Sequence, residues 1–94
     1  MQRQELRESM TKDGISQRFV NAGFSALDYL KDSKRCPAGA AYSWEIADAV
    51  FGEPNMGWST ARLEMPTILS LFEDRGVFEQ RKCDRRYVAK SGLE

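Results

Sequence analysis

A short basic segment near the end of the chain holds the side chains best suited to bind an anion. Arg81, Lys82, Arg85 and Arg86 lie within six consecutive positions, and guanidinium and ammonium groups are common protein ligands of phosphate oxygens. Residues 75–90 contain six cations and two acids, although the whole chain has a formal net charge of zero. A neutral protein with one basic end can bind an anionic polymer through that end. The alternative interpretation is that these charges only protect a solvated sheet edge.

Other kinds of chemistry find little support in the sequence. The chain contains no histidine, which removes histidine-based acid–base catalysis, nucleophile activation and most zinc sites. The two cysteines, Cys36 and Cys83, lack metal-ligand spacing, and we expect both to be reduced because the chain has no export signal. We therefore expect a protein that is not an enzyme and that holds no metal and no cofactor.

The composition predicts one small globular domain. Apolar residues make up 41% of the 94 residues and charged residues 30%, which is ordinary for such a domain. No apolar run approaches the roughly 20 residues of a membrane span, and the N-terminus lacks the core of a signal peptide. We expect a cytoplasmic protein with no membrane partner, folded over residues 15–92. Residues 1–14 are polar and are expected to form a flexible or frayed arm.

The first helix is predicted to begin after Ser16, a suitable N-cap. One face of this helix should be buried, and Phe24 and Tyr29 lie off that face, so they are candidates for a dimer contact. The predicted buried positions are Phe19, Gly23, Ala26, Leu27 and Leu30.

A short extended segment at residues 38–42 suits a strand that could pair with a later hairpin. Ser43 is then expected to cap a second helix, which Gly52 ends. The side chains expected on the buried side of this helix are Trp44, Ile46, Ala47, Val50 and Phe51.

The third helix contains a proline within its apolar pattern. Pro66 removes a backbone hydrogen bond and costs roughly 3 kcal/mol in a helix interior. The helix therefore either kinks at Pro66 or is split, and we favour two segments that meet at residues 64–66. Gly76 can take the left-handed conformation that ends a helix. The β-forming pairs Val77-Phe78 and Tyr87-Val88 then predict a hairpin around the basic segment.

This order of elements resembles the winged helix-turn-helix superfamily of bacterial, archaeal and phage DNA-binding proteins. The segment Ser43-Trp-Glu-Ile-Ala-Asp-Ala-Val is similar to the first helix of the helix-turn-helix motif, and Leu71-Phe-Glu-Asp-Arg-Gly-Val-Phe-Glu-Gln-Arg is similar to the end of the recognition helix and the first wing strand. The resemblance implies a mostly α fold with a small β-hairpin, in the order helix, strand, helix, helix, strand, strand. Two features depart from the pattern, namely the long connection over residues 52–59 and Pro66.

The resemblance also implies where DNA would bind. The third helix would approach the major groove and the hairpin would lie on the phosphate backbone. Affinity would come mainly from the hairpin, because the third helix has few cations and has acids nearby. The implied nucleic-acid-binding residues are Thr60, Arg62, Thr67 and Ser70 on the helix and Arg81, Lys82, Arg85 and Arg86 on the hairpin.

Two functions are compatible with these features. The first is a transcriptional regulator that binds double-stranded DNA as a homodimer, since one small domain reads few base pairs. The second is a winged-helix protein-interaction module in a replication, transcription or secretion assembly, which the zero net charge and the weakly basic third helix favour.

Overall fold

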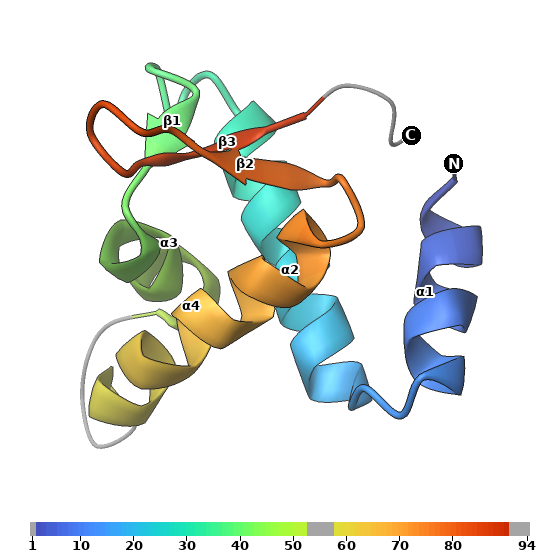
Figure 1. Ribbon diagram of the computed structural model, residues 1–94. Coiled ribbons are helices and arrows are strands. Elements are labelled where there is room, and N and C mark those ends of the chain that lie inside the picture. The colour runs from blue at the N-terminus through green and yellow to red at the C-terminus, as the bar shows by residue number, and fades with distance from the viewer. Residues whose placement is uncertain (1, 53–57, 91–94) are drawn as a thin grey trace.

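The chain is mostly helical, with a small antiparallel sheet, as a computed structural model shows (Figure 1). The structure describes residues 2–52 and 58–90, and within residues 58–62 it describes only the backbone. This arrangement confirms the predicted α+β class. The elements are α1 (Arg3–Lys12), α2 (Gln17–Lys31), β1 (Ala40–Ala41), α3 (Ser43–Phe51), α4 (Trp58–Glu73), β2 (Phe78–Gln80) and β3 (Tyr87–Ala89).

The sheet joins the predicted hairpin to the predicted short strand. Its order is β1-β3-β2, and both pairings are antiparallel. Ala41 of β1 and Gln80 of β2 both face Tyr87 of β3 in the register. Because β1 directly precedes α3, this pairing holds the hairpin beside the start of that helix (Figure 1).

Helix α2 begins as its sequence predicts, and its predicted buried face is confirmed except at Phe19, which is only partly buried. The Ser16 hydroxyl accepts a hydrogen bond from the backbone N–H of Phe19 at 3.3 Å, which satisfies one of the free donors at a helix start. Ala26, Leu27 and Leu30 are buried. Gly23 lies against the ring of Phe72 in α4, so closely that a methyl group at this position would overlap the ring.

Phe24 was expected outside the core, and this expectation is wrong. Its side chain is only 6% exposed, and its ring meets the Phe72 ring edge-on with centroids 5.6 Å apart. The guanidinium groups of Arg3 and Arg7 in α1 lie over the same ring, at 5.6 and 5.0 Å from its centroid. Helix α1 therefore covers the surface on which Phe24 was expected to contact a second chain.

Residues 3–12 form helix α1 where a flexible or frayed arm was expected. Leu6 and Met10 are fully buried, and Arg7 donates hydrogen bonds to Asn21 and Gln17 of α2 at 2.7 and 3.0 Å. The prediction was based on the overall polarity of this segment and did not consider its two apolar side chains. These lie one helical turn apart on the same face, which is enough to dock a short helix.

Helix α3 differs from its prediction at its first residues. Ser43 is the first helical residue and Tyr42 is the N-cap, with the backbone N–H of Tyr42 donating to Glu45 Oε1 at 2.9 Å. Trp44 was expected to be buried, yet it is 48% exposed, while Ile46 and Ala47 are buried. Gly52 ends the helix with a φ of 85°, as predicted.

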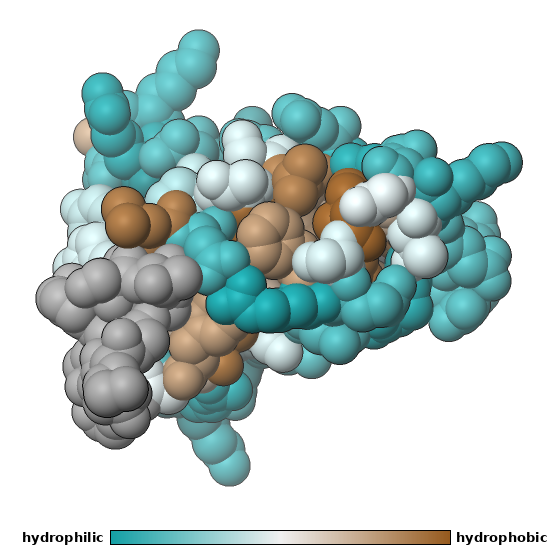
Figure 2. All heavy atoms as spheres, turned by 90° about the horizontal axis from the view of Figure 1, so that it is seen from below, coloured by the Kyte–Doolittle hydropathy of each residue, from teal (hydrophilic) through white to brown (hydrophobic). Residues whose placement is uncertain are grey.

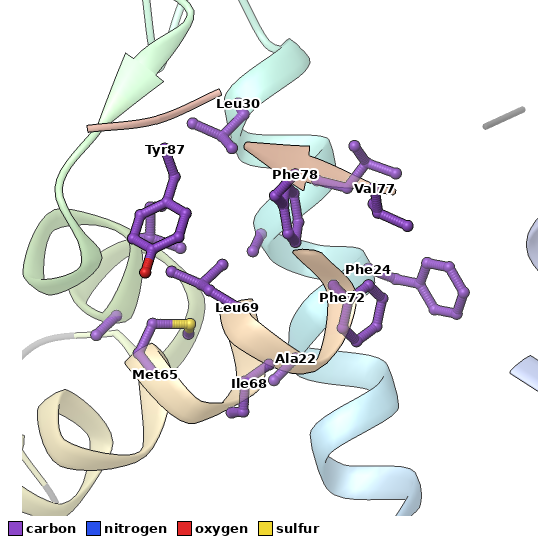
Figure 3. Close-up of a cluster of buried hydrophobic side chains, with 14 of the residues drawn as sticks. Ala22, Phe24, Leu30, Met65, Ile68, Leu69, Phe72, Val77, Phe78 and Tyr87 are labelled. Carbon is purple, nitrogen blue, oxygen red and sulfur yellow. The ribbon is translucent and has the colours of Figure 1, made fainter. Parts of the chain in front are cut away.

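Helix α4 is continuous through Pro66, so the favoured split into two segments is wrong. Pro66 is exposed, whereas Met65, Ile68, Leu69 and Phe72 are fully buried on the other side of the helix. Burying each such side chain contributes about 1.5–3 kcal/mol, and together they offset the roughly 3 kcal/mol that an interior proline costs. Figure 3 shows Met65 and Leu69 beside Tyr87 and Phe72 beside Phe78, whereas Ile68 lies next to Ala22 of α2.

Gly76 turns the chain from α4 into the hairpin, as predicted. Its φ is 79°, and its N–H donates to the carbonyl of Glu73 at 2.9 Å while the N–H of Val77 donates to the carbonyl of Phe72 at 3.0 Å. This pair of bonds is the Schellman motif that ends many helices. It fixes the direction in which the hairpin leaves α4.

We predict that Gly23→Ala destabilises the fold. The added methyl group overlaps Phe72, and we expect a cost at the upper end of the about 1–3 kcal/mol typical of overpacking. This exceeds the roughly 1 kcal/mol by which alanine is favoured over glycine in a helix. Urea unfolding followed by circular dichroism measures the effect. The same substitution in a Phe72→Leu background should cost less, and an equal cost in both backgrounds would contradict the proposed overlap.

We also predict that Leu6→Ala lowers the free energy of unfolding by about 2–5 kcal/mol, because it opens a cavity under α1. Glu5→Ala on the exposed side of the same helix is the control, and its effect should stay within about 0.5 kcal/mol. Thermal unfolding of the two variants distinguishes a docked helix from a frayed arm, for which both substitutions would be neutral.

Candidate nucleic-acid interface

The basic turn, residues 81–86, connects β2 to β3 and is closed by its own backbone. The N–H of Arg81 donates to the carbonyl of Arg86 at 2.8 Å, and the N–H of Arg85 donates to the carbonyl of Arg81 at 2.9 Å. Arg85 has a φ of 63°, a left-handed conformation that is unusual for a residue other than glycine. Gln80 supports it by donating from Nε2 to the carbonyl of Arg85 at 3.0 Å. The turn therefore has a defined shape.

Asp84 organises this turn by binding two of its arginines. Arg81 donates from Nε to Asp84 Oδ1 at 3.1 Å and also pairs with Oδ2 through Nη2. The backbone N–H of Arg86 donates to Oδ1 at 3.1 Å, and its guanidinium Nε lies 4.0 Å from Oδ2. The guanidinium of Arg81, which was expected to bind phosphate, is thus bound to the carboxylate of Asp84.

These contacts keep Asp84 ionised. The side-chain hydrogen bond from Arg81, followed by the backbone N–H of Arg86, lowers the pKa of the Asp84 carboxyl, and the carboxylate raises the pKa of Arg81. A depressed carboxyl pKa means that the contact is present above the ordinary aspartate range and is lost only as the pH falls through the lowered value. The turn therefore keeps its shape at neutral pH.

Lys82 and Arg85 are the cations of the turn that remain available. Both side chains are exposed, and neither forms an ion pair or hydrogen bond within the described part of the chain. Cys83 lies between them in sequence and is exposed, whereas Cys36 is buried. Of the four cations expected to contact phosphate, the structure thus leaves two with no partner and gives Arg81 and Arg86 intramolecular ones.

Arg86 leads from the turn to a pair of aromatic rings at the start of α3. Its guanidinium carbon lies 5.0 Å from the centroid of the Tyr42 ring. Tyr42 and Trp44 are stacked, with centroids 6.0 Å apart and planes inclined by only 7°. This is an offset-stacked geometry.

The expected groove-facing helix, α4, presents two of its predicted residues to solvent. Thr67 and Ser70 are exposed, whereas the side chains of Thr60 and Arg62 lie outside the described residues. Leu63 is 77% exposed. The structure therefore brings Thr67 and Ser70 onto an exposed face and leaves the other two predictions open.

Glu64, one of the acids on α4, forms an ion pair with an arginine of α2. Arg18 donates from Nη1 and Nη2 to the two carboxylate oxygens of Glu64, at 2.5 and 2.8 Å. This hydrogen-bonded pair lowers the pKa of Glu64, which stays ionised beside its partner. Nothing in the spacing of Arg18 and Glu64, 46 positions apart, could have revealed the pair.

The hairpin and α4 are also joined by a side chain. Glu73 Oε2 accepts a hydrogen bond from the backbone N–H of Gln80 at 3.1 Å. Burial raises the pKa of the Tyr87 phenol, and the charge of Glu73 adds to that effect. Together with Gly76, this contact sets the position of the basic turn relative to α4.

Sequence reasoning missed three contributors to the site, namely Asp84, Arg18 and the stacked pair of Tyr42 and Trp44. Asp84 had a local signal, because it lies three positions after Arg81 and two before Arg86. Tyr42 and Trp44 are two positions apart at the boundary of a strand and a helix, where no periodicity predicts that their rings stack.

Comparisons with known proteins do not extend this description, since no protein-family model, curated protein or solved structure matches the chain. Among residues 2–52 and 58–90, no helix is long and apolar enough to cross a membrane. The same part of the chain has no group of three or more Cys, Asp or Glu side chains placed to hold a metal ion.

If the basic turn binds DNA phosphates, Asp84→Asn should strengthen binding to duplex DNA at low salt. The amide removes a negative charge and releases the guanidinium of Arg81, so the log–log salt slope should steepen by about 0.9 for one additional phosphate contact. Fluorescence anisotropy over a salt series measures both quantities. Glu79→Gln on exposed β2 makes the same change in charge without releasing an arginine. An equal gain in both variants would attribute the effect to net charge alone.

Proposed function

We propose that this chain is a winged helix-turn-helix protein that binds double-stranded DNA and acts as a transcriptional regulator. In this proposal α2, α3 and α4 are the three helices of the domain and the β2–β3 hairpin is its wing. Helix α4 enters the major groove and the basic turn lies on the phosphate backbone.

The order of the elements supports the fold assignment. From α2 onward the chain runs helix, strand, helix, helix, strand, strand, and the short β1 completes the sheet by pairing with the last strand. The hairpin follows α4 after a single turn at Gly76. A groove-binding helix and its wing would thus be held in one rigid unit.

The observation on which the proposal depends most is the pair of available cations on the turn. Lys82 and Arg85 project from a turn whose conformation is fixed by Asp84 and Gln80. A preorganised cation loses less conformational entropy when it binds a phosphate than one on a mobile loop. Phosphate contacts of this kind supply most of the non-specific affinity for DNA.

The exposed face of α4 is compatible with a groove. Thr67 and Ser70 can donate to bases or phosphates, and Glu64 is paired with Arg18 and so adds little repulsion. Thr60 and Arg62 remain part of the proposed face. We also propose a homodimer, because one domain of this size reads few base pairs. Phe24 is covered in this structure, which leaves the partly buried Tyr29, whose ring lies 5.2 Å from the Arg35 guanidinium, as the candidate contact.

A protein-interaction module is the second candidate, and the exposed Leu63 favours it. Figure 2 shows hydrophobic side chains gathered on the face seen from below, bordered by hydrophilic ones. Leu63 is 77% exposed, and Phe19 and Phe51 are only partly buried. These residues belong to α4, α2 and α3, and exposed hydrophobic surface of this kind would suit a protein partner better than a phosphate backbone.

We predict that Lys82→Ala with Arg85→Ala weakens binding to a mixed-sequence duplex and reduces the log–log salt slope by up to about 1.8, which corresponds to two lost phosphate contacts. The control, Arg3→Ala with Lys12→Ala, removes the same charge from α1, at the opposite side of the molecule from the basic turn (Figure 1). The control should change the slope much less.

The outcome separates the two candidates. If the two double variants change the affinity and the salt slope equally, the proposed contact between the hairpin and the DNA backbone is contradicted. If the unaltered protein binds duplex more weakly than roughly 10⁻⁴ M at low salt, the weak end of non-specific affinity, the protein-interaction module is the better assignment.

A further inference from the structure

Arg85 is the one residue other than glycine that has a positive φ in the described part of the chain, at 63°. This left-handed region costs free energy for a residue with a Cβ atom, and turns usually place glycine or asparagine there. Residues held in such conformations are concentrated at binding and catalytic sites, where the surrounding structure enforces them. The presence of arginine at this position therefore calls for a physical reason.

Three hydrogen bonds hold the backbone on both sides of Arg85. Its N–H donates to the carbonyl of Arg81 at 2.9 Å, and its carbonyl accepts from Gln80 Nε2 at 3.0 Å. The next N–H along the chain, that of Arg86, donates to Asp84 Oδ1 at 3.1 Å. None of these bonds uses the side chain of Arg85, so a glycine at this position could form the same turn.

The side chain of Arg85 forms no contact that would offset the conformational cost. It is exposed, and it makes no ion pair or hydrogen bond within residues 2–52 and 58–90. Arg81 and Arg86 of the same turn differ in this respect, because both contact the carboxylate of Asp84. A residue that breaks a local preference without a gain inside the fold is expected at a functional site.

Gln80 connects the position of Arg85 to helix α4. Its backbone N–H donates to Glu73 Oε2 near the end of that helix at 3.1 Å, and its side chain holds the carbonyl of Arg85. The basic turn lies at the end of the hairpin remote from Gly76 (Figure 1). Two hydrogen bonds of one residue thus relate the left-handed position in the turn to the helix.

We infer that arginine occupies this left-handed position because its guanidinium binds a phosphate of the DNA backbone, and that Gln80 is its positioning residue. This inference rests on the proposed function and adds the reason for the conformation of Arg85. A guanidinium binds phosphate through two parallel N–H groups. Its orientation, and hence the backbone that carries it, therefore matters more than it would for the point charge of a lysine.

Glycine and alanine at position 85 separate the cost of the backbone from the role of the side chain. Both Arg85→Gly and Arg85→Ala remove the guanidinium, but glycine alone adopts a φ of 63° without strain. Arg85→Ala should melt within about 3 °C of the unaltered protein. Arg85→Gly should melt about 4–8 °C above Arg85→Ala. The control is Lys82, which is exposed and has no positive φ, so Lys82→Gly should melt no higher than Lys82→Ala.

Binding of a mixed-sequence duplex, measured by fluorescence anisotropy over a salt series, tests the role of the side chain. Arg85→Gly and Arg85→Ala should both weaken binding and reduce the log–log salt slope by about 0.9, for one lost phosphate contact. Circular dichroism checks that each variant is folded.

A double-mutant cycle tests Gln80. Gln80→Met keeps the length of the side chain and the backbone bond to Glu73 but removes the donor to Arg85. It should weaken duplex binding by about twofold or more when Arg85 is present. It should have no further effect in the Arg85→Ala background, a dependence that a general loss of stability would not produce.

The failures can be told apart. If duplex binds but both Arg85 variants keep the affinity and the salt slope, the inference is overturned and the proposed function stands. If Arg85→Ala melts well below the unaltered protein, the side chain stabilises the fold and the inferred reason for its conformation is overturned. If Gln80→Met acts equally with and without Arg85, Gln80 is not its positioning residue. If the unaltered protein does not bind duplex, both the inference and the proposed function fail.

Discussion

The close approach of α4 to α2 at Phe72 is the contact on which the remaining structure depends. The ring of Phe72 occupies the space that a side chain at Gly23 would fill. It also meets Phe24 edge-on at 5.6 Å and Phe78 of β2 at 5.8 Å. One buried ring thus touches α2 and the sheet, and through Phe24 it supports the docking of α1. Because packed interiors tolerate little change in volume, this contact fixes the helices relative to the hairpin.

The position of the hairpin follows from that packing and from the end of α4. Gly76 reverses the chain by a Schellman motif, and Glu73 binds the backbone of Gln80. The basic turn is then held against β1 and α3 through β3. The four cations of this turn fall into two groups. Arg81 and Arg86 contact Asp84, and Arg86 also lies over the Tyr42 ring, whereas the side chains of Lys82 and Arg85 are exposed to solvent.

The formal net charge of zero does not reveal which charged side chains are paired and which are exposed. Several acids of the chain are paired with arginines from other elements, namely Glu64 with Arg18, Asp13 with Arg75 and Asp28 with Arg3. Exposed pairs of this kind contribute little to stability, but each one reduces the repulsion that an approaching anion would meet. The proposed interface therefore depends on where charges are paired, and the total charge says little about it.

The sequence by itself determined the elements whose signals are local. Neighbouring residue types determine the Ser16 cap, the helix ends at Gly52 and Gly76, the hairpin and a short strand within residues 38–42. The buried positions Ala26, Leu27 and Leu30 of α2 also follow from local spacing. Only the tertiary structure decided what depends on contacts distant in sequence. Burial of Met65, Ile68, Leu69 and Phe72 outweighs the proline of α4, and the docking of α1 buries Phe24. Pairing of β1 with β3 likewise brings Tyr42 to Arg86 and leaves Trp44 exposed, because the energy of each arrangement comes from partners that no local pattern identifies.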